Sequence, residues 1–223
     1  MKHLSRISIL ALAALLFAWS AHAQPVDLGP YYNLVEGRQI LYLNLEYDGV
    51  SLVPDDTVVQ VVTPLASGLT GVLDYHSTSW DLEDLALWQE EADGHYFAGN
   101  VKVDTGEIEI HYPPVGPIGG LMEVGVPVVD EAWIIKDGVL DHQERYELSL
   151  LATGASCQTA AGTFDDCAVL LLEIFVSDTL VEQQYLIWAR DVGEILAFFL
   201  TKTAGPSLEL TSVLVAVDIL NLP

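Results

Sequence analysis

Acidic side chains are the commonest groups in this sequence that could do chemistry. Of its 223 residues, 32 are Asp or Glu and only 8 are Lys or Arg, so the formal net charge is −24 at pH 7. Paired carboxylates serve as acid and base in glycosidases, and carboxylates that converge in one loop bind calcium. Adjacent acids lie at Asp55–Asp56, Asp81–Asp84, Glu90–Asp93, Asp130–Glu131 and Asp165–Asp166. Such clusters arise without function in so acidic a chain, and none carries the Asp-x-Asp-x-Asp-Gly pattern of a calcium loop.

The histidines and serines form no catalytic or metal-binding motif. Beyond residue 23 the histidines are His76, His95, His111 and His142, which stand far apart in the sequence. Zinc proteases carry His-Glu-x-x-His and many hydrolases carry Gly-x-Ser-x-Gly, and this sequence has neither. It also lacks a Gly-rich phosphate loop. We therefore predict no catalytic residue, no resident cofactor and no metal ligand.

Three tryptophans are candidates for a ligand-binding face. Trp88, Trp133 and Trp188 all fall in segments with strand character, where they could line a surface for a sugar or a lipid. Aromatic side chains in strands also pack in cores and in cross-strand pairs, so this alternative stays open.

Two cysteines are predicted to form one disulfide. Cys157 and Cys167 enclose a short loop with a strand-like run on each side. Such pairs form disulfides in exported proteins, which fold in an oxidising compartment. A metal pair is the alternative, but no histidine or further cysteine lies nearby in the sequence.

The first 23 residues have the pattern of an export signal. Lys2 and Arg6 precede an apolar run from Ile7 to Trp19, and Ala21-His22-Ala23 is typical of a signal peptidase site. We expect cleavage after Ala23, a mature chain that begins at Gln24, and a periplasmic or secreted location. No later stretch is predicted to span a membrane.

The charge of the chain excludes some partners. A surface this acidic repels the phosphates of nucleic acids, which proteins hold with Lys and Arg, and it also disfavours anionic membrane surfaces. Two explanations of the acidity remain open, namely solubility in a salty exterior and the binding of cations or cationic partners.

Short strands separated by turns account for residues 24–223. Gln39 to Tyr47 is rich in strand-forming types, and Glu107 to Tyr112 (EIEIHY) alternates charged and apolar residues. Asp48-Gly49 and Asp137-Gly138 are strong turn signals. Ser77 to Glu91 is ambiguous because it also has helical spacing, and we interpret Leu85 to Glu91 as a strand. The prediction is a single all-β domain, an antiparallel curved sheet of about ten to twelve strands that forms an open barrel or a sandwich.

Several short motifs carry a resemblance to a known group of proteins. They are Tyr31 to Gly37 (YYNLVEG), Pro113-Pro114, Gly125 with Trp133, Thr159 to Cys167 (TAAGTFDDC) and Trp188 to Ile195 (WARDVGEI). The pattern resembles that of bacterial exported β-proteins with a Tyr-x-x-Leu-x-x-Gly opening and an Ala-Gly-Thr-Phe-x-x-Cys hairpin. Asn33 stands where proline is usual, and Arg190-Asp191 replaces Pro-Gly.

The resemblance implies a fold and, by analogy, a binding function. Such proteins are similar in architecture to the outer-membrane lipoprotein carriers, whose curved sheet has an apolar concave face. We expect a non-enzymatic cell-envelope protein that binds a hydrophobic ligand or an envelope partner protein. A hydrolase that acts on carbohydrates through paired carboxylates, and an acidic calcium-binding structural protein, are the alternatives.

Overall fold

The structure is a computed structural model that describes residues 25–65, 68–76, 82–118, 120–202 and 207–220. The predicted signal segment, residues 1–23, lies outside the described residues. The strands are β1 (Val26–Asp27), β2 (Gln39–Tyr47), β3 (Leu52–Pro64), β4 (Leu69–His76), β5 (Leu82–Glu91), β6 (Gly94–Lys102), β7 (Ile108–Ile118), β8 (Leu121–Met122), β9 (Val128–Lys136), β10 (Val139–Thr159), β11 (Gly162–Val176), β12 (Thr179–Ala189), β13 (Gly193–Thr201) and β14 (Glu209–Leu220). Among the described residues, no helix is long and apolar enough to cross a bilayer.

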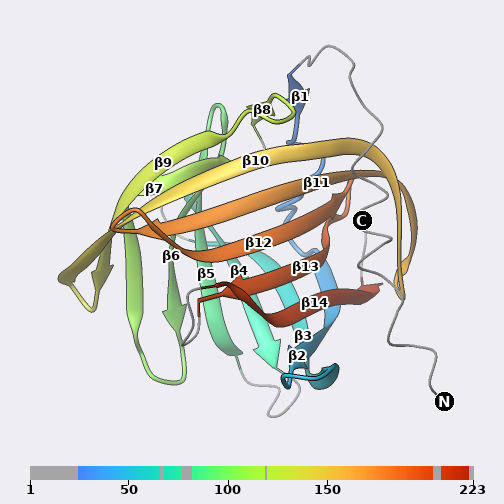
Figure 1. Cartoon of the computed structure of the whole chain (residues 1–223), viewed down its shortest axis with the longest axis horizontal. Coiled ribbons are helices and arrows are strands. Elements are labelled where there is room, and N and C mark those ends of the chain that lie inside the picture. Colours follow the sequence, from blue (N-terminus) through green and yellow to red (C-terminus); the bar gives the residue numbers. More distant parts are fainter. Residues whose placement is uncertain (1–24, 66–67, 77–81, 119, 203–206, 221–223) are drawn as a thin grey trace.

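Twelve of these strands form one closed antiparallel barrel (Figure 1). Neighbours in the sequence are neighbours in the sheet from β2 to β7 and from β9 to β14; β7 pairs with β9, and β14 pairs with β2 to close the circle. Strands β10 to β14 run across Figure 1, whereas β4 to β7 run down it. The prediction of an all-β antiparallel fold is confirmed. The barrel is closed rather than open, although β7 and β9 pair only through residues 109–112 and 133–136.

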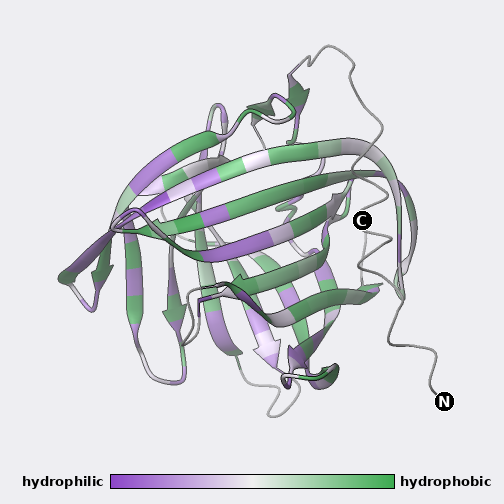
Figure 2. Cartoon of the chain, in the orientation of Figure 1, coloured by the Kyte–Doolittle hydropathy of each residue, from purple (hydrophilic) through white to green (hydrophobic). Residues whose placement is uncertain are grey.

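Local sequence explains the hairpins of this meander. The turn between β9 and β10 places Asp137 and Gly138 at φ values of 50° and 80°, the left-handed conformation that two-residue hairpins require. Leu85 to Glu91 lies in strand β5, as interpreted from the sequence, whereas residues 77–81 of the ambiguous segment lie outside the described residues. Apolar and hydrophilic residues alternate along the strands (Figure 2), because successive side chains point to opposite faces of the sheet.

An N-terminal segment, residues 25–38, packs across one end of the barrel. It begins with β1, which pairs with β8, and its Leu28 and Tyr31 are only 0% and 2% exposed. These side chains join a core cluster with residues of β10 to β13, including Trp188. The segment therefore closes this end of the barrel interior with apolar side chains.

Hydrogen bonds fix this segment to the opposite strands. The Tyr31 hydroxyl donates to Asp166 at 2.7 Å, and Arg190 bonds both Asp166 (2.6 Å) and the Tyr31 oxygen (3.1 Å). Asn33 donates to the carbonyl of Asp191 at 2.6 Å. Three segments that carry the sequence resemblance thus meet at one place, where they hold the N-terminal segment.

Arg38 completes this attachment from inside the protein. Its guanidinium is 6% exposed and donates to the carbonyl of Val192 at 2.7 Å. It lies directly over Gly193, where an added Cβ would come within 2.1 Å of Arg38 Nη1. Gly193 has a φ of 104°, so both its backbone conformation and its neighbour require glycine.

Candidate functional site

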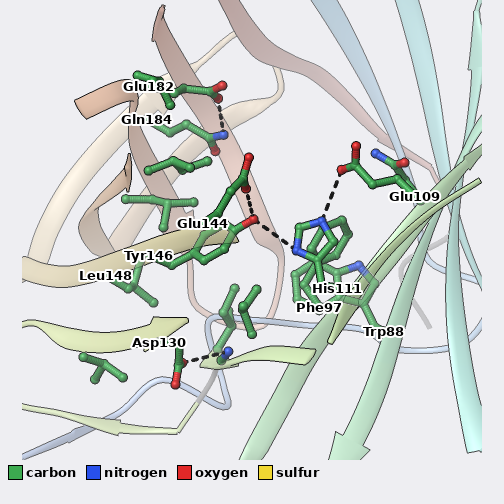
Figure 3. A pocket seen from close by; sticks show the side chains of 18 residues that line it. Trp88, Phe97, Glu109, His111, Asp130, Glu144, Tyr146, Leu148, Glu182 and Gln184 are labelled. Atoms are coloured by element: carbon green, nitrogen blue, oxygen red, sulfur yellow. Dashed lines mark hydrogen bonds and ion pairs between the residues drawn. The ribbon is translucent and has the colours of Figure 1, made fainter. Parts of the chain in front are cut away.

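A half-open cavity of about 430 Å³ lies between the walls of the barrel (Figure 3). Its walls come from two parts of the sheet, with β5, β6 and β7 on one side and β9 to β12 on the other. Half of its lining is apolar, formed by Trp88, Phe97, Val115, Ile118, Val128, Leu148, Leu172, Ile174 and Val181. The volume falls within the range of about 300–1,000 Å³ that small-molecule sites occupy.

Successive side chains of a strand point to opposite faces of the sheet, and this alternation determines which residues line the cavity. On β9, Val128 and Asp130 face the cavity, whereas Val129 between them is 50% exposed on the outer surface. On β7, Glu109 and His111 face inward and Ile108 is 43% exposed, so the charged face of this strand is the inner one. The barrel interior is therefore partly polar.

A hydrogen-bonded chain of four side chains lies along the cavity wall. Glu109 Oε1 is 3.2 Å from His111 Nε2, and His111 Nδ1 is 3.1 Å from the Tyr146 hydroxyl. The Tyr146 hydroxyl in turn donates to Glu144. Burial lowers the pKa of His111, which is 4% exposed. Burial raises the pKa of Tyr146, and the hydrogen bond with Glu144 raises it further.

Two further carboxylates face the same cavity. Burial raises the pKa of Glu182, whose carboxylate accepts a hydrogen bond from Gln184 at 2.6 Å, and the nearby charge of Glu144 raises it further. Burial also raises the pKa of Asp130, although the backbone N–H of Gly116 donates to it at 3.0 Å. Both shifts mean that the surroundings of Glu182 and Asp130 favour the protonated carboxyl group over the ionised carboxylate.

A second pair of buried acids lies inside the barrel away from this cavity lining. Burial raises the pKa of Glu194, on β13, to about 7. An interaction with Trp188 and the positive charge of Arg38 lower the pKa and so offset part of this rise. The Trp188 indole nevertheless forms no hydrogen bond of normal geometry. Burial and the charge of Asp84 raise the pKa of Asp74, on β4, to about 7, and one of its oxygens has no hydrogen-bond partner.

The three tryptophans singled out from the sequence lie in three different environments. Trp88 lines the cavity and packs against Phe97 with ring centroids 5.1 Å apart. Trp188 is 2% exposed in the core, where the Tyr32 ring lies between it and Trp88, tilted against both, with centroid distances of 4.9 and 5.0 Å. Trp133 lies opposite Tyr112 in the sheet and is 44% exposed on the outer surface, so it does not line the interior cavity.

Trp133 belongs instead to a second hollow of about 520 Å³. This hollow is mostly polar and includes Arg145 and the β11–β12 turn residues Ser177 and Asp178. Arg145 stacks on Phe175 there, with its guanidinium carbon 4.0 Å from the ring centroid.

The two cysteines face each other across β10 and β11, next to the register pair Ala155 and Cys167. Both are thiols in the structure, with Cys157 half-buried and Cys167 buried. An interaction between the two side chains lowers the pKa of Cys157 and raises that of Cys167. The disulfide between them stays a prediction.

Among the described residues of the acidic clusters found in the sequence, only Asp130 lines the cavity. Asp166 bonds Tyr31 of the N-terminal segment, and Asp56 bonds His76 at 2.8 Å.

Sequence reasoning missed Glu109, His111, Glu144, Tyr146 and Glu182 as a group. Their shared signal is alternation in two strands, Glu-x-His on β7 and Glu-x-Tyr-x-Leu on β10, which places each pair on one face of its strand. In the described part of the chain, no group of three or more His, Cys, Asp and Glu side chains is arranged to hold a metal ion.

Comparisons with known proteins give two distant structural likenesses. No protein-family model and no curated protein matches the chain. A protein from Bacteroides fragilis, described provisionally as exported and as having a YmcC-like fold, is 12% identical with a TM-score of 0.46. The match covers 86% of this chain and 100% of that one. A provisionally assigned lipoprotein from Parabacteroides distasonis is 12% identical with a TM-score of 0.43 over 87% of this chain and 100% of that one.

Proposed function

We propose that this chain is an exported, non-enzymatic cell-envelope protein that binds a hydrophobic small molecule inside its barrel. The observation that carries the proposal is the cavity of about 430 Å³, whose apolar half is formed by aromatic and aliphatic side chains. Burying apolar ligand surface against such a wall contributes roughly 25 cal/mol per Å². Export rests on the N-terminal sequence, with its basic start, apolar run and small residues before Gln24.

Cavity filling tests the proposed site. Val128→Trp should fill part of the cavity, whereas Val129→Trp places the same side chain on the outer surface of the same strand. We expect an environment-sensitive apolar dye to bind the mature wild-type chain and the Val129→Trp variant, and to bind Val128→Trp at least about tenfold more weakly. Equal dye affinity in both variants would refute the site.

The stability of the variants must be measured in parallel. Overpacking costs about 1–3 kcal/mol, so Val128→Trp could lose binding by unfolding. A thermal melt of each variant separates the two causes. Leu172→Phe, a smaller change on the same wall two strands away, provides a second variant with the same expected loss of dye binding.

A hydrolase is the second candidate, and one arrangement favours it. Glu182 has a raised pKa and lies in the same cavity as Glu144, as an acid and base of a glycosidase would. Activated aryl glycosides and aryl esters test this function. Turnover that Glu182→Gln and Glu144→Gln both abolish would establish it, and turnover equal in wild type and both variants would exclude these carboxylates.

A further inference from the structure

The polar half of the cavity carries an excess of acidic side chains. Four carboxylates line it, from Glu109, Asp130, Glu144 and Glu182, and none of the described lining residues is Lys or Arg. One lysine and one histidine lie next to cavity carboxylates: Lys136 Nζ is 3.2 Å from Glu109, and His142 Nε2 is 2.7 Å from Glu144. Their side chains are 41% and 30% exposed, outside the set that lines the cavity.

Glu182 and Asp130 have neutral partners only. Glu182 accepts from the Gln184 amide, and Asp130 accepts from a backbone N–H. Glu144 and Glu182 also repel each other across the cavity wall (Figure 3). Buried carboxylates without a positive partner are costly, so a positive group placed among them would gain substantial interaction energy.

The hydrogen-bonded chain determines the charge of one part of the cavity wall. Its three contacts join Glu109, His111, Tyr146 and Glu144, and each contact needs one shared proton. The Tyr146 hydroxyl and a neutral His111 supply one proton each, and ionised carboxylates supply none. All three contacts therefore exist together only when the network holds one additional proton. That proton is part of the network and lowers its negative charge by one, so Glu182 and Asp130 remain the cavity carboxylates without a positive partner.

We propose that the ligand of this cavity is a cationic amphiphile, with an ammonium group held among Glu144, Glu182 and Asp130 and an apolar part against the aromatic wall. This proposal rests on the proposed function and adds the ligand's chemical class. The faces of Trp88 and Phe97 lie in the same cavity and attract cations as well as apolar groups. An amphiphile with an anionic headgroup would bring like charge against the four carboxylates.

Three probes that share one alkyl chain test the inference. Decylammonium, decanol and decanoate differ in the charge of the polar group, and isothermal titration calorimetry of the mature chain measures the affinity of each at pH 7. We expect decylammonium to bind at least about tenfold more tightly than decanol, equivalent to about 1.4 kcal/mol, and decanoate to bind most weakly. Decanol binding as tightly as decylammonium would overturn the inference and leave the proposed function intact. Failure of all three to bind would overturn both.

Two matched variants locate the effect. Glu182→Gln removes one cavity charge, and Glu173→Gln removes one on the outer face of the neighbouring strand β11, where Glu173 accepts from Gln183. We expect Glu182→Gln to weaken decylammonium about tenfold, to leave decanol unchanged and to strengthen decanoate. Glu173→Gln should change each affinity less than about twofold, because solvent screens a charge on the outer surface. Equal effects of the two variants would show that net charge, not the cavity, selects the cation, and would refute the assignment.

Discussion

Replacing Glu194 by glutamine should make the protein more stable in mild alkali. The side chain lies inside the barrel, and burial raises its pKa from 4.5 to about 7. Because the folded state binds the proton more tightly than the unfolded state, this group contributes most stability below pH 4.5, and the contribution is lost as the pH rises through 7. Glu194→Gln keeps the shape of the neutral carboxyl group and cannot ionise.

The size of the effect follows from the same shift. Each pKa unit corresponds to about 1.4 kcal/mol, so the rise from 4.5 to about 7 makes the ionised folded state about 3 kcal/mol less stable. Glu194 keeps some contact with water inside the barrel, which makes this figure an upper bound. We therefore expect the free energy of unfolding of Glu194→Gln to exceed that of the wild type by about 1–3 kcal/mol at pH 8 and by less than about 1 kcal/mol at pH 5, where the carboxyl is largely ionised in the unfolded state only.

Urea denaturation at pH 5, 6, 7 and 8 measures this difference directly. The Glu173→Gln variant is the control, because it removes a charge from the outer face of the barrel and reports the general relief of acidic repulsion. Subtracting its effect isolates the buried group. If Glu194→Gln and the wild type lose stability with the same slope between pH 5 and pH 8, the carboxyl does not titrate inside the barrel as argued.

Three further predictions concern the interior acids, the cysteines and the attachment of the N-terminal segment. Asp74→Asn should also gain stability at pH 8 relative to pH 5, because burial and a like charge raise the pKa of Asp74 to about 7; the same urea series measures it. The exported chain should leave Cys157 and Cys167 unreactive to iodoacetamide until reduced, and reduction should cost roughly 2.5–3 kcal/mol of stability; thiols that react at once without reductant would contradict this. Gly193→Ala should cost about 2 kcal/mol in a thermal or urea melt, because a methyl group there collides with Arg38 and the φ of 104° strains alanine; an unchanged midpoint would show that Arg38 can move aside freely.

The strands could be predicted because their signals are local. Gln39–Tyr47 was predicted to the residue from its composition, and the Asp137-Gly138 turn followed from a dipeptide that adopts the left-handed conformation. Closure of the barrel could not be predicted in this way. It depends on the pairing of β14 with β2, two strands at opposite ends of the chain whose register no local pattern specifies.

The site was harder to predict because alternation does not reveal which face of a strand points inward. In EIEIHY the sequence suggests a half-buried strand, but the inner face is the one with Glu109 and His111. For the same reason Trp133 was grouped with Trp88, although the two point to opposite sides of the barrel wall. A polar interior reverses the usual assignment of faces and becomes visible only when the whole sheet is closed.

The barrel should hold a small hydrophobic molecule, and native mass spectrometry of the mature chain purified from its own envelope can detect that molecule. We expect a protein peak heavier than the chain alone, with an added mass that organic extraction recovers as a hydrophobic compound, and retention of that mass by Val129→Trp but not by Val128→Trp. A bare chain in every preparation, together with no dye binding by the wild type, would contradict it.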